Sequence, residues 1–345
     1  MGTPPGPPTD LAGAGVRRAS ALPAGASGAA GARAATHPLH GEHATWQEKN
    51  CYVDLWIELL HALGLEPMAL WPHVVALDFE GDQFTFFKPP HAELRALYGI
   101  DVQELTVWRP LADHAIEHLS AGRPLSVEVD AFHLPDVAGT DYRTRHAKTT
   151  IVMVDIDRDA RRLGYFHNAG RFTLQGEDYD ALFATPPAGA LPLPLFAEMV
   201  KLERRIRRPT RELQALALQH LETHLAWRPR HNPVRRFAQR LQHDLPRLRE
   251  GGVERWHAYA FGTVRQLGAA FELAARGVAW HAPAATSPMA QAATAFEAIS
   301  THAKSLILKG ARAVTSSRPT DLGPLLETLA QAWDDGMAAL DTRPA

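Results

Sequence analysis

The chain has 345 residues, of which 46% are hydrophobic and 21% are charged, and its formal net charge is −2 at pH 7. This length allows two domains or one large domain with an extension, and the composition is ordinary for a globular chain with an apolar core. No apolar run approaches the roughly 20 residues that a membrane helix needs, and the near-neutral charge disfavours a dedicated nucleic-acid binder. We therefore expect a soluble, cytoplasmic protein without a membrane partner.

Residues 1–41 are rich in glycine, proline, alanine and serine and carry almost no large apolar side chains. Such a segment cannot bury enough surface to offset the entropy lost on ordering, so we expect a disordered tail. Its three arginines, Arg17, Arg18 and Arg33, against the single acid Asp10 also fit a transit peptide. The tail lacks the continuous apolar core of a secretory signal, which argues against secretion.

The segment 50–64 predicts an amphipathic helix that begins after Asn50 and ends at Gly64. Asn50 is a favourable N-cap, which places Cys51 in the first helical turn. Cys51 is the one cysteine of the chain, so an intramolecular disulfide and a cysteine-rich zinc site are both excluded. Backbone N–H groups and the positive end of the helix dipole favour a thiolate at this position. The alternative is a small hydrophobic side chain that packs inward.

Residues 74–183 show alternating strand and helix patterns. The predicted elements are two short strands within 74–88, a helix at 91–98, a strand at 102–108, a helix at 111–121, a strand at 124–130, a hairpin of strands 149–157 and 163–168, and a helix at 177–183. The acidic run Asp78–Asp82 is typical of a turn, since it lacks the spacing of a calcium loop. We expect an α+β domain over residues 42–185, with no metal or cofactor site.

Residues 186–194 are rich in proline and predict a linker. From residue 195 to 345 helical patterns dominate, and we expect helices at about 195–228, 231–249, 252–277, 287–309 and 320–340. The chain is therefore predicted to end in a helical C-terminal region.

The order of three residues suggests a reaction. Cys51 begins a helix, His146 lies just before the first strand of the later hairpin, and Asn168 ends the second strand. Papain-like enzymes place nucleophile, base and orienting amide in this order, because attack on an acyl carbon needs a thiolate, an imidazole and a group that holds the imidazole. Gln47, four residues before Cys51, is a candidate for the oxyanion hole. Alternatively, His146 caps a strand and Asn168 forms an ordinary turn; His133 and His167 are substitute bases.

Several segments carry a family resemblance. NCYVDLWIELLHALG, DFEGDQFTFFKPP, LYGIDVQEL, VEVDAFHLPD and LGYFHNAGRFTL resemble a bacterial family catalogued as domain of unknown function 1839, over about residues 42–340. The pattern from Gly122 to Asn168 is also similar to the N-terminal domain of the butirosin-pathway acyltransferase family. The second resemblance implies a papain-like domain, in which a cysteine helix packs on an antiparallel sheet. It also implies transfer of an aminoacyl group from a carrier-protein thioester to an amine.

By that resemblance Cys51 is the nucleophile, His146 the base and Asn168 the orienting residue. The chain departs from the acyltransferase pattern at two of its positions. The family usually has a second histidine three residues after the first, where this chain has Thr149, and its acid is normally an aspartate, where this chain has Asn168.

Between residues 201 and 249 the chain carries 13 lysines or arginines against four acids. A solvated helix face is one interpretation, and docking of an acidic acyl or aminoacyl carrier protein is the other. The residues predicted to bind such a partner are Arg204, Arg205, Arg207, Arg208, Arg235 and Arg236.

The pattern as a whole predicts a cysteine-dependent acyl or aminoacyl transferase. Its donor would be a carrier-protein or coenzyme thioester and its acceptor an amine, with the acyl group on the phosphopantetheine arm of the partner and no cofactor of its own. One alternative keeps the fold and uses water as acceptor, as a thioesterase or amidase does. The other is a non-catalytic papain-like module that binds a carrier protein or a peptide.

Overall fold

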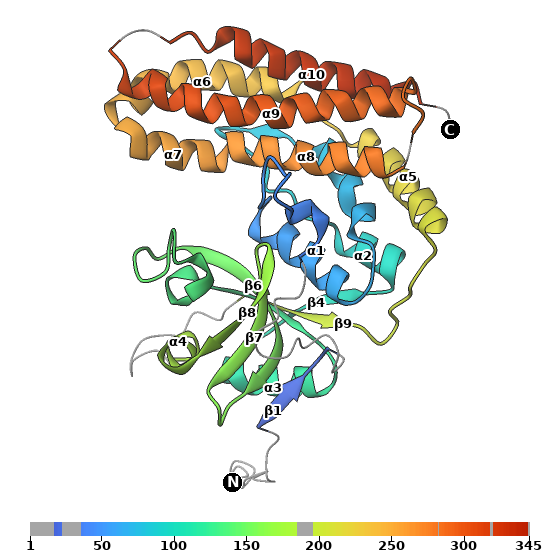
Figure 1. Cartoon of the computed structure of the whole chain (residues 1–345), viewed down its shortest axis with the longest axis vertical. Helices are drawn as coiled ribbons and strands as arrows, with labels where there is room; N and C mark the ends of the chain where they lie inside the picture. Colours follow the sequence, from blue (N-terminus) through green and yellow to red (C-terminus); the bar gives the residue numbers. More distant parts are fainter. Residues whose placement is uncertain (1–16, 23–35, 185–195, 282, 318–319, 344–345) are drawn as a thin grey trace, which may run out of the picture.

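The computed structural model describes residues 17–22, 36–184, 196–281, 283–317 and 320–343. A β-sheet flanked by helices forms one half of the molecule, and a bundle of long helices forms the other (Figure 1). The strands are β1 Arg18–Ser20, β2 Phe79–Glu80, β3 Gln83–Phe84, β4 Asp101–Leu105, β5 Leu125–Asp130, β6 Lys148–Asp157, β7 Arg162–His167, β8 Gly170–Gln175 and β9 Ala197–Lys201. The helices of the first half are α1 Cys51–Ala62, α2 His91–Tyr98, α3 Leu111–Ser120 and α4 Gly176–Leu182, with 3₁₀ segments η1 Pro38–His40, η2 Pro67–Ala76, η3 Ala131–His133 and η4 Pro135–Val137. The second half contains α5 Thr210–Ala226, α6 Pro233–Glu250, α7 Gly252–Gly262, α8 Val264–Trp280, α9 Pro288–Thr315 and α10 Gly323–Asp341.

Within the described residues the main sheet has seven strands, all paired antiparallel. Six strands follow the order β4-β9-β5-β6-β7-β8, and β1 pairs with the C-terminal end of β6. A separate hairpin joins β2 and β3 around the turn at residues 81–82. The prediction of a mixed α+β half with an antiparallel sheet, followed by a helical region, is confirmed.

The long central strand β6 separates two apolar cores because both of its faces are covered. Val152 and Val154 pack with α1 on one face, whereas Ile151 and Met153 pack with α3 on the other. Successive strand residues point to opposite faces, so each core receives every second residue. Nearly every residue of β6 is buried as a result.

A third apolar core joins the two halves. It contains η2 and the segment around residues 39–87 together with side chains of α6, α7, α8, α9 and α10. At Gly277 of α8 an added Cβ would lie 2.0 Å from an atom of the Trp71 indole, and at Gly268 it would lie 2.5 Å from the Trp46 indole. These two positions have space only for glycine because α8 approaches the indoles so closely. The helical bundle and the cysteine helix therefore share one core.

Two predictions were wrong in part, the disordered tail up to residue 41 and the helix from residue 195. Arg18–Ser20 form a strand inside the predicted disordered tail, and His40 of the same segment is 6% exposed. Residues 197–201 form β9, the strand between β4 and β5, where a helix from residue 195 was expected. Strand pairing overrides helical periodicity there, because β9 completes hydrogen bonds of two neighbouring strands.

Other differences are smaller. Strand β8 was not predicted, and the helix expected at 252–277 is divided at Thr263. The helix at 91–98 has the predicted bounds, and α1 begins at Cys51 as predicted. The proline-rich linker, residues 186–194, lies outside the described residues. Among the helices that the structure describes, none is both long enough and apolar enough to cross a bilayer.

Candidate functional site

Cys51 is the first residue of α1, and the helix start around it is well capped. The Asn50 side-chain oxygen accepts hydrogen bonds from the N–H groups of Tyr52 (3.1 Å) and Val53 (2.9 Å), while its amide donates to the Phe87 carbonyl (3.0 Å). The Cys51 thiol is partly exposed, and its Sγ lies 3.9 Å from Thr150 Oγ1 on β6. The predicted position of the cysteine, at a helix N-terminus that packs on the antiparallel sheet, is confirmed.

His146 lies two residues before β6, on the loop that follows η4. Its Nδ1 donates to Asp130 Oδ2 at 2.6 Å, and its ring stacks on Phe132 with centroids 4.3 Å apart. The side chain is 73% exposed. Hydrogen bonds from His146 and from the N–H groups of Phe132 and Ala147 outweigh burial and hold the pKa of Asp130 below its ordinary value. The hydrogen-bond partner of His146 is therefore Asp130, and among the hydrogen bonds of the described residues none joins His146 to Asn168.

The other predicted site residues do not complete a hydrogen-bonded triad with Cys51. Asn168 adopts a left-handed conformation (φ 45°) in the tight turn between β7 and β8. Gln47 is exposed on the segment before α1. Among the hydrogen bonds of the described residues, none joins Cys51 to His146, Asn168 or Gln47.

A second histidine–aspartate pair lies at the end of β7. His167 is 1% exposed, with Nδ1 2.5 Å from Asp136 Oδ2 and Nε2 2.7 Å from Thr149 Oγ1. Asp136 also accepts a hydrogen bond from the Tyr165 hydroxyl. Tyr165 belongs to the core on the α3 side, so this network lies on the sheet face opposite α1 and Cys51. Both ring nitrogens of His167 are engaged, which is typical of a structural histidine.

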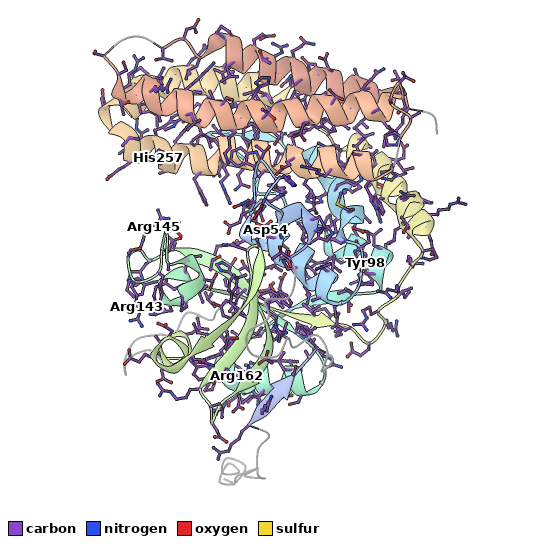
Figure 2. All side chains as sticks on the ribbon, in the orientation of Figure 1. Asp54, Tyr98, Arg143, Arg145, Arg162 and His257 are labelled. Atoms are coloured by element: carbon purple, nitrogen blue, oxygen red, sulfur yellow. The ribbon has the colours of Figure 1, made fainter. Side chains whose placement is uncertain are left out.

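Buried charges join the segment before Cys51 to α1. His40 is fully buried at its side chain, with Nδ1 2.5 Å from Glu58 Oε1 and Nε2 2.9 Å from Asp54 Oδ1. Burial disfavours the imidazolium, but hydrogen bonds to the two carboxylates prevail and raise the pKa of His40 to about 9. Asp54 lies at the end of α1 nearest to the bundle (Figure 2) and also accepts from the N–H of Lys49.

Glu272 of α8 ties the same segment to the helical bundle. Its carboxylate accepts from the N–H groups of Thr45 (2.6 Å) and Trp46 (3.0 Å) and lies 3.2 Å from Lys49 Nζ. The Lys49 ammonium is completely buried and donates to the carbonyls of Leu39 and Trp46 at 2.6 Å each. Removing one partner of such a buried pair costs about 3–5 kcal/mol. The backbone that leads into Cys51 is thus held rigidly.

A polar pocket of about 760 Å³ lies between the two halves, at the same end of α1. Its walls come from the segment 44–48, the β7–β8 turn at Ala169, and the side chains of Arg265 on α8 and Lys304 on α9. His40 and Thr36 complete the lining. Because the pocket adjoins the segment that ends at Cys51, it is the structural candidate for a ligand site.

A further polar cluster lies beside Cys51 on the α1 face of the sheet. Tyr52 donates to Glu198 Oε2 at 3.0 Å and lies 2.8 Å from His91 Nε2, which is 3.2 Å from Glu198 Oε1. Ser126 also donates to Glu198 Oε2. Burial raises the pKa of Glu198, but the hydrogen bonds from His91, Tyr52 and Ser126 prevail and lower it below its ordinary value. The cluster fixes α1 to β5 and β9.

Four of the six arginines predicted to bind a partner have partners within the protein. Arg207 donates to the Gly64 carbonyl just after the end of α1, and Arg208 donates to two carbonyls in the last turn of α2. Arg235 pairs with Glu327 and Asp334 of α10, and Arg236 pairs with Asp78. These side chains stabilise helix ends and helix contacts.

Arg204 and Arg205 are exposed, and the described residues contain no ion pair of either. They belong to the segment that includes Arg207, which contacts the end of α1 distant from Cys51. A 12-residue helix is roughly 18 Å long. Arg204 and Arg205 therefore lie toward the end of α1 that is distant from Cys51.

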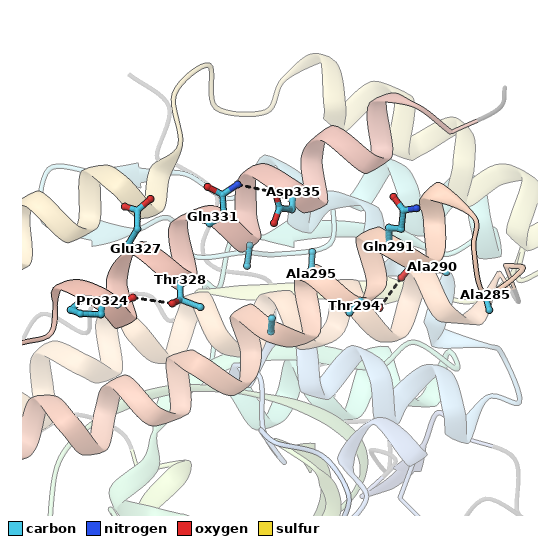
Figure 3. A pocket seen from close by; sticks show the side chains of 12 residues that line it. Ala285, Ala290, Gln291, Thr294, Ala295, Pro324, Glu327, Thr328, Gln331 and Asp335 are labelled. Carbon is cyan, nitrogen blue, oxygen red and sulfur yellow. Dashed lines mark hydrogen bonds between the residues drawn. The ribbon is translucent and has the colours of Figure 1, made fainter.

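A second pocket lies on the bundle, between α9 and α10 (Figure 3). Alanines and polar side chains line it, and several of the polar groups have partners within the bundle, as Gln331 has in Asp335 (2.8 Å) and Glu327 has in Arg235. Helix α10 is the helix farthest from the sheet (Figure 1), so this groove is separate from the Cys51 region. In the part of the chain that the structure describes, no group of histidine, cysteine, aspartate or glutamate side chains is arranged to hold a metal ion.

Sequence reasoning missed most of the polar network around Cys51. One signal was available: Asp54 and Glu58 stand four residues apart inside the apolar stripe of α1. Charged side chains at such positions are buried only when they are paired. Their partner His40 could not be found, because it lies in a segment whose composition predicts disorder.

Comparison with protein families gives two adjoining matches. The DUF1839 N-terminal domain matches residues 35–202, and the DUF1839 C-terminal domain matches residues 210–342. The first match ends just after β9, and the second begins with α5, in agreement with the end of the sheet. No curated protein matches the chain. The two matches cover most of the chain, and the protein belongs to the DUF1839 family.

Proposed function

We propose that this protein is a cysteine-dependent acyl or aminoacyl transferase, with a carrier-protein or coenzyme thioester as donor and an amine as acceptor. The observation that carries the proposal is the position of Cys51. It is a partly exposed thiol at a well-capped helix N-terminus, beside a polar pocket formed by both halves of the protein. A helix N-terminus stabilises the thiolate that attacks an acyl carbon.

The reaction would proceed in two balanced steps. In the first, the Cys51 thiolate attacks the donor thioester, a C–S bond to Cys51 forms as the donor C–S bond breaks, and the donor sulfur takes the proton that the base had removed from Cys51. In the second, the amine attacks the acyl-cysteine, a C–N bond forms as the C–S bond to Cys51 breaks, and a proton of the amine passes to the Cys51 sulfur. Thioester exchange is nearly thermoneutral, so the protein chiefly needs an activated thiolate and exclusion of water.

His146 remains the proposed base, with Asp130 as its orienting group. Asp130 holds Nδ1 and leaves Nε2 to move a proton, the arrangement that catalytic imidazoles require. The exposed loop of His146 has to approach Cys51 when substrate binds, because catalytic hydrogen bonds tighten in the complex. A papain-like arrangement, in which the His146 imidazole faces the Cys51 thiol, is part of this proposal.

An acidic carrier protein is the proposed donor, and its phosphopantetheine arm would present the thioester. Arg204 and Arg205 are the exposed cations that support docking, at the end of α1 distant from the thiol. The arm would then have to span roughly 18 Å, the length of α1, to present the thioester to Cys51. Charged surfaces of this kind mainly raise the association rate.

One observation favours a non-catalytic binding module instead. The side chain that faces the Cys51 thiol is Thr150, which cannot act as a general base near neutral pH. If His146 never reaches the thiol, the pocket would bind a carrier protein or peptide without turnover.

Intact-mass spectrometry tests the proposal directly. Incubation with an acyl-carrier thioester or an acyl-N-acetylcysteamine thioester is expected to add one acyl mass, and addition of an amine should remove it as the amide. Cys51→Ala is the control and should gain no mass, since the chain has one cysteine. Release of free acid instead of amide would indicate the thioesterase. Absence of an adduct, with binding retained, would favour the binding module.

A further inference from the structure

The pocket beside Cys51 combines opposite charges at short range. Glu48 Oε2 lies 3.7 Å from Arg265 Nη2, and Lys304 forms part of the same wall. Glu48 precedes Cys51 by three residues, so a group bound to its carboxylate lies at the entrance to the cysteine helix. Apart from the buried His40, which is paired with Asp54 and Glu58, the lining offers one anion and two cations on and around the segment that leads into Cys51.

Both cations are anchored by only part of their donor capacity. Lys304 Nζ donates to the Thr45 carbonyl at 2.8 Å and lies 5.0 Å from the Trp46 ring centroid. Arg265 donates to the Glu48 carbonyl at 3.2 Å, and its guanidinium stacks 5.0 Å from the Phe261 ring. An ammonium has three donors and a guanidinium has five, so each retains donors for a ligand.

The backbone of the pocket is held before a ligand arrives. Thr45 and Trp46 donate to the buried Glu272 carboxylate, and Lys49 pairs with the same group. A backbone held in this way loses little further conformational entropy when a ligand binds. A cavity of about 760 Å³ is of the size that small-molecule ligands occupy.

We propose that this pocket binds the α-ammonium and α-carboxylate groups of an amino acid, which is the amine acceptor of the acyl transfer. The ammonium contacts Glu48, and the carboxylate contacts Arg265 and Lys304. A simple anion would be repelled by Glu48, and a simple cation by the other two. A ligand with both charges on one carbon matches the lining on each side. In its catalytic part this inference rests on the transferase function proposed above.

Glu48 also supports the chemistry of the acceptor. Burial raises the pKa of its carboxyl, and the nearby Asp54 adds to the effect. A carboxylate with a raised pKa accepts protons more readily. The bound ammonium would give one proton to Glu48, and the free amine would attack the acyl-cysteine. As the C–N bond forms and the C–S bond breaks, a second proton passes to the Cys51 thiolate.

Ligand-observed NMR on the Cys51→Ala variant tests the binding alone. Each of the twenty standard L-amino acids is titrated, and at least one should bind saturably. Its amide, which lacks the carboxylate, and its des-amino acid, which lacks the ammonium, should each bind at least tenfold more weakly. Failure of every amino acid to bind would overturn the inference, as would equal binding of the three forms.

Matched variants locate the site. Glu48→Gln and Lys304→Gln should each weaken binding at least tenfold, whereas Arg228→Gln, which pairs with Asp341 and does not line the pocket, should leave it unchanged. Lys304 is exposed, so its replacement keeps the fold even if Glu48→Gln does not. Unchanged binding in Lys304→Gln and in a folded Glu48→Gln would contradict the proposal.

This experiment separates the two proposals, because the Cys51→Ala protein cannot be acylated. An acyl adduct on wild-type Cys51 without amino-acid binding would retain the transferase and reject this acceptor. Amino-acid binding without an adduct would retain the pocket and reject the transferase.

Discussion

Two histidine–aspartate pairs at neighbouring strand ends show how burial determines what an imidazole can do. In both pairs the ring Nδ1 bonds an aspartate, at 2.6 Å for His146 and 2.5 Å for His167. The His146 side chain is 73% exposed, whereas His167 is 1% exposed and also contacts Thr149 through Nε2. The exposed pair keeps one nitrogen free for proton transfer, and the buried pair uses both nitrogens to hold the fold.

The largest effect is expected when the exposed His146–Asp130 pair is broken. His146→Ala should reduce acyl transfer about 10²–10⁴-fold, the usual contribution of a general base. It should change the free energy of unfolding by less than about 0.5 kcal/mol, because the side chain is mostly solvated. Steady-state kinetics and chemical denaturation measure the two quantities. A variant with full activity would remove His146 from the mechanism and leave His133 as the substitute base to test.

The buried pair should respond in the opposite way. His167→Ala leaves the Asp136 carboxylate and the Thr149 hydroxyl without their partner in a dry environment. Unfolding should become easier by about 3 kcal/mol or more, as measured by denaturant titration. Activity per folded molecule should stay close to that of the wild type. A large loss of turnover in a stably folded variant would show that the structural and catalytic roles are assigned to the wrong pairs.

A third histidine, His40, differs from the other two because its ring bonds two carboxylates, those of Asp54 and Glu58. Its folded pKa of about 9 exceeds the ordinary unfolded value near 6.5, so its stabilisation is complete below pH 6.5 and is lost as the pH rises through 9. The loss amounts to at most about 3 kcal/mol. The neighbouring Lys49, whose pKa burial lowers, changes with pH in the opposite sense.

Because Lys49 changes with pH in the opposite sense, the free energy of unfolding of the wild type is compared with that of His40→Gln at each pH. The stability difference between the two proteins should be largest near pH 6 and should shrink toward pH 10. A difference that does not change with pH would mean that His40 is neutral when folded.

The smallest effect concerns the exposed arginines. Replacing Arg204 and Arg205 by glutamine should raise the KM for a carrier-bound thioester a few-fold and weaken its dependence on salt, because steering by surface charge is screened. Turnover of a small thioester should be unchanged. Arg228→Gln, which removes an ion pair with Asp341, serves as the matched control. Equal losses on both substrates would show that Arg204 and Arg205 support the fold instead.

Local chemistry in the sequence determined much of this protein. The Asn50 cap, the apolar stripe of the cysteine helix and the alternating hairpin after residue 148 each depend on neighbours a few residues away, so the start of α1 and the strands β5, β6 and β7 were predicted from sequence. Residues 197–201 became a strand because β4 and β5 leave hydrogen-bonding groups that only another strand can satisfy. No local sequence pattern in residues 197–201 indicates that β4 and β5 require a strand between them.

The candidate site also divides into features that local sequence predicts and features that only tertiary packing decides. Sequence order placed Cys51 at a helix N-terminus, but the partners of each polar group lie far along the chain. Asp130 is 16 residues from His146, and Glu272 is 226 residues from Trp46. The tertiary structure alone decided which histidine is solvated, which arginines are engaged, and which charges line the pocket, because burial and pairing arise only when distant segments pack together.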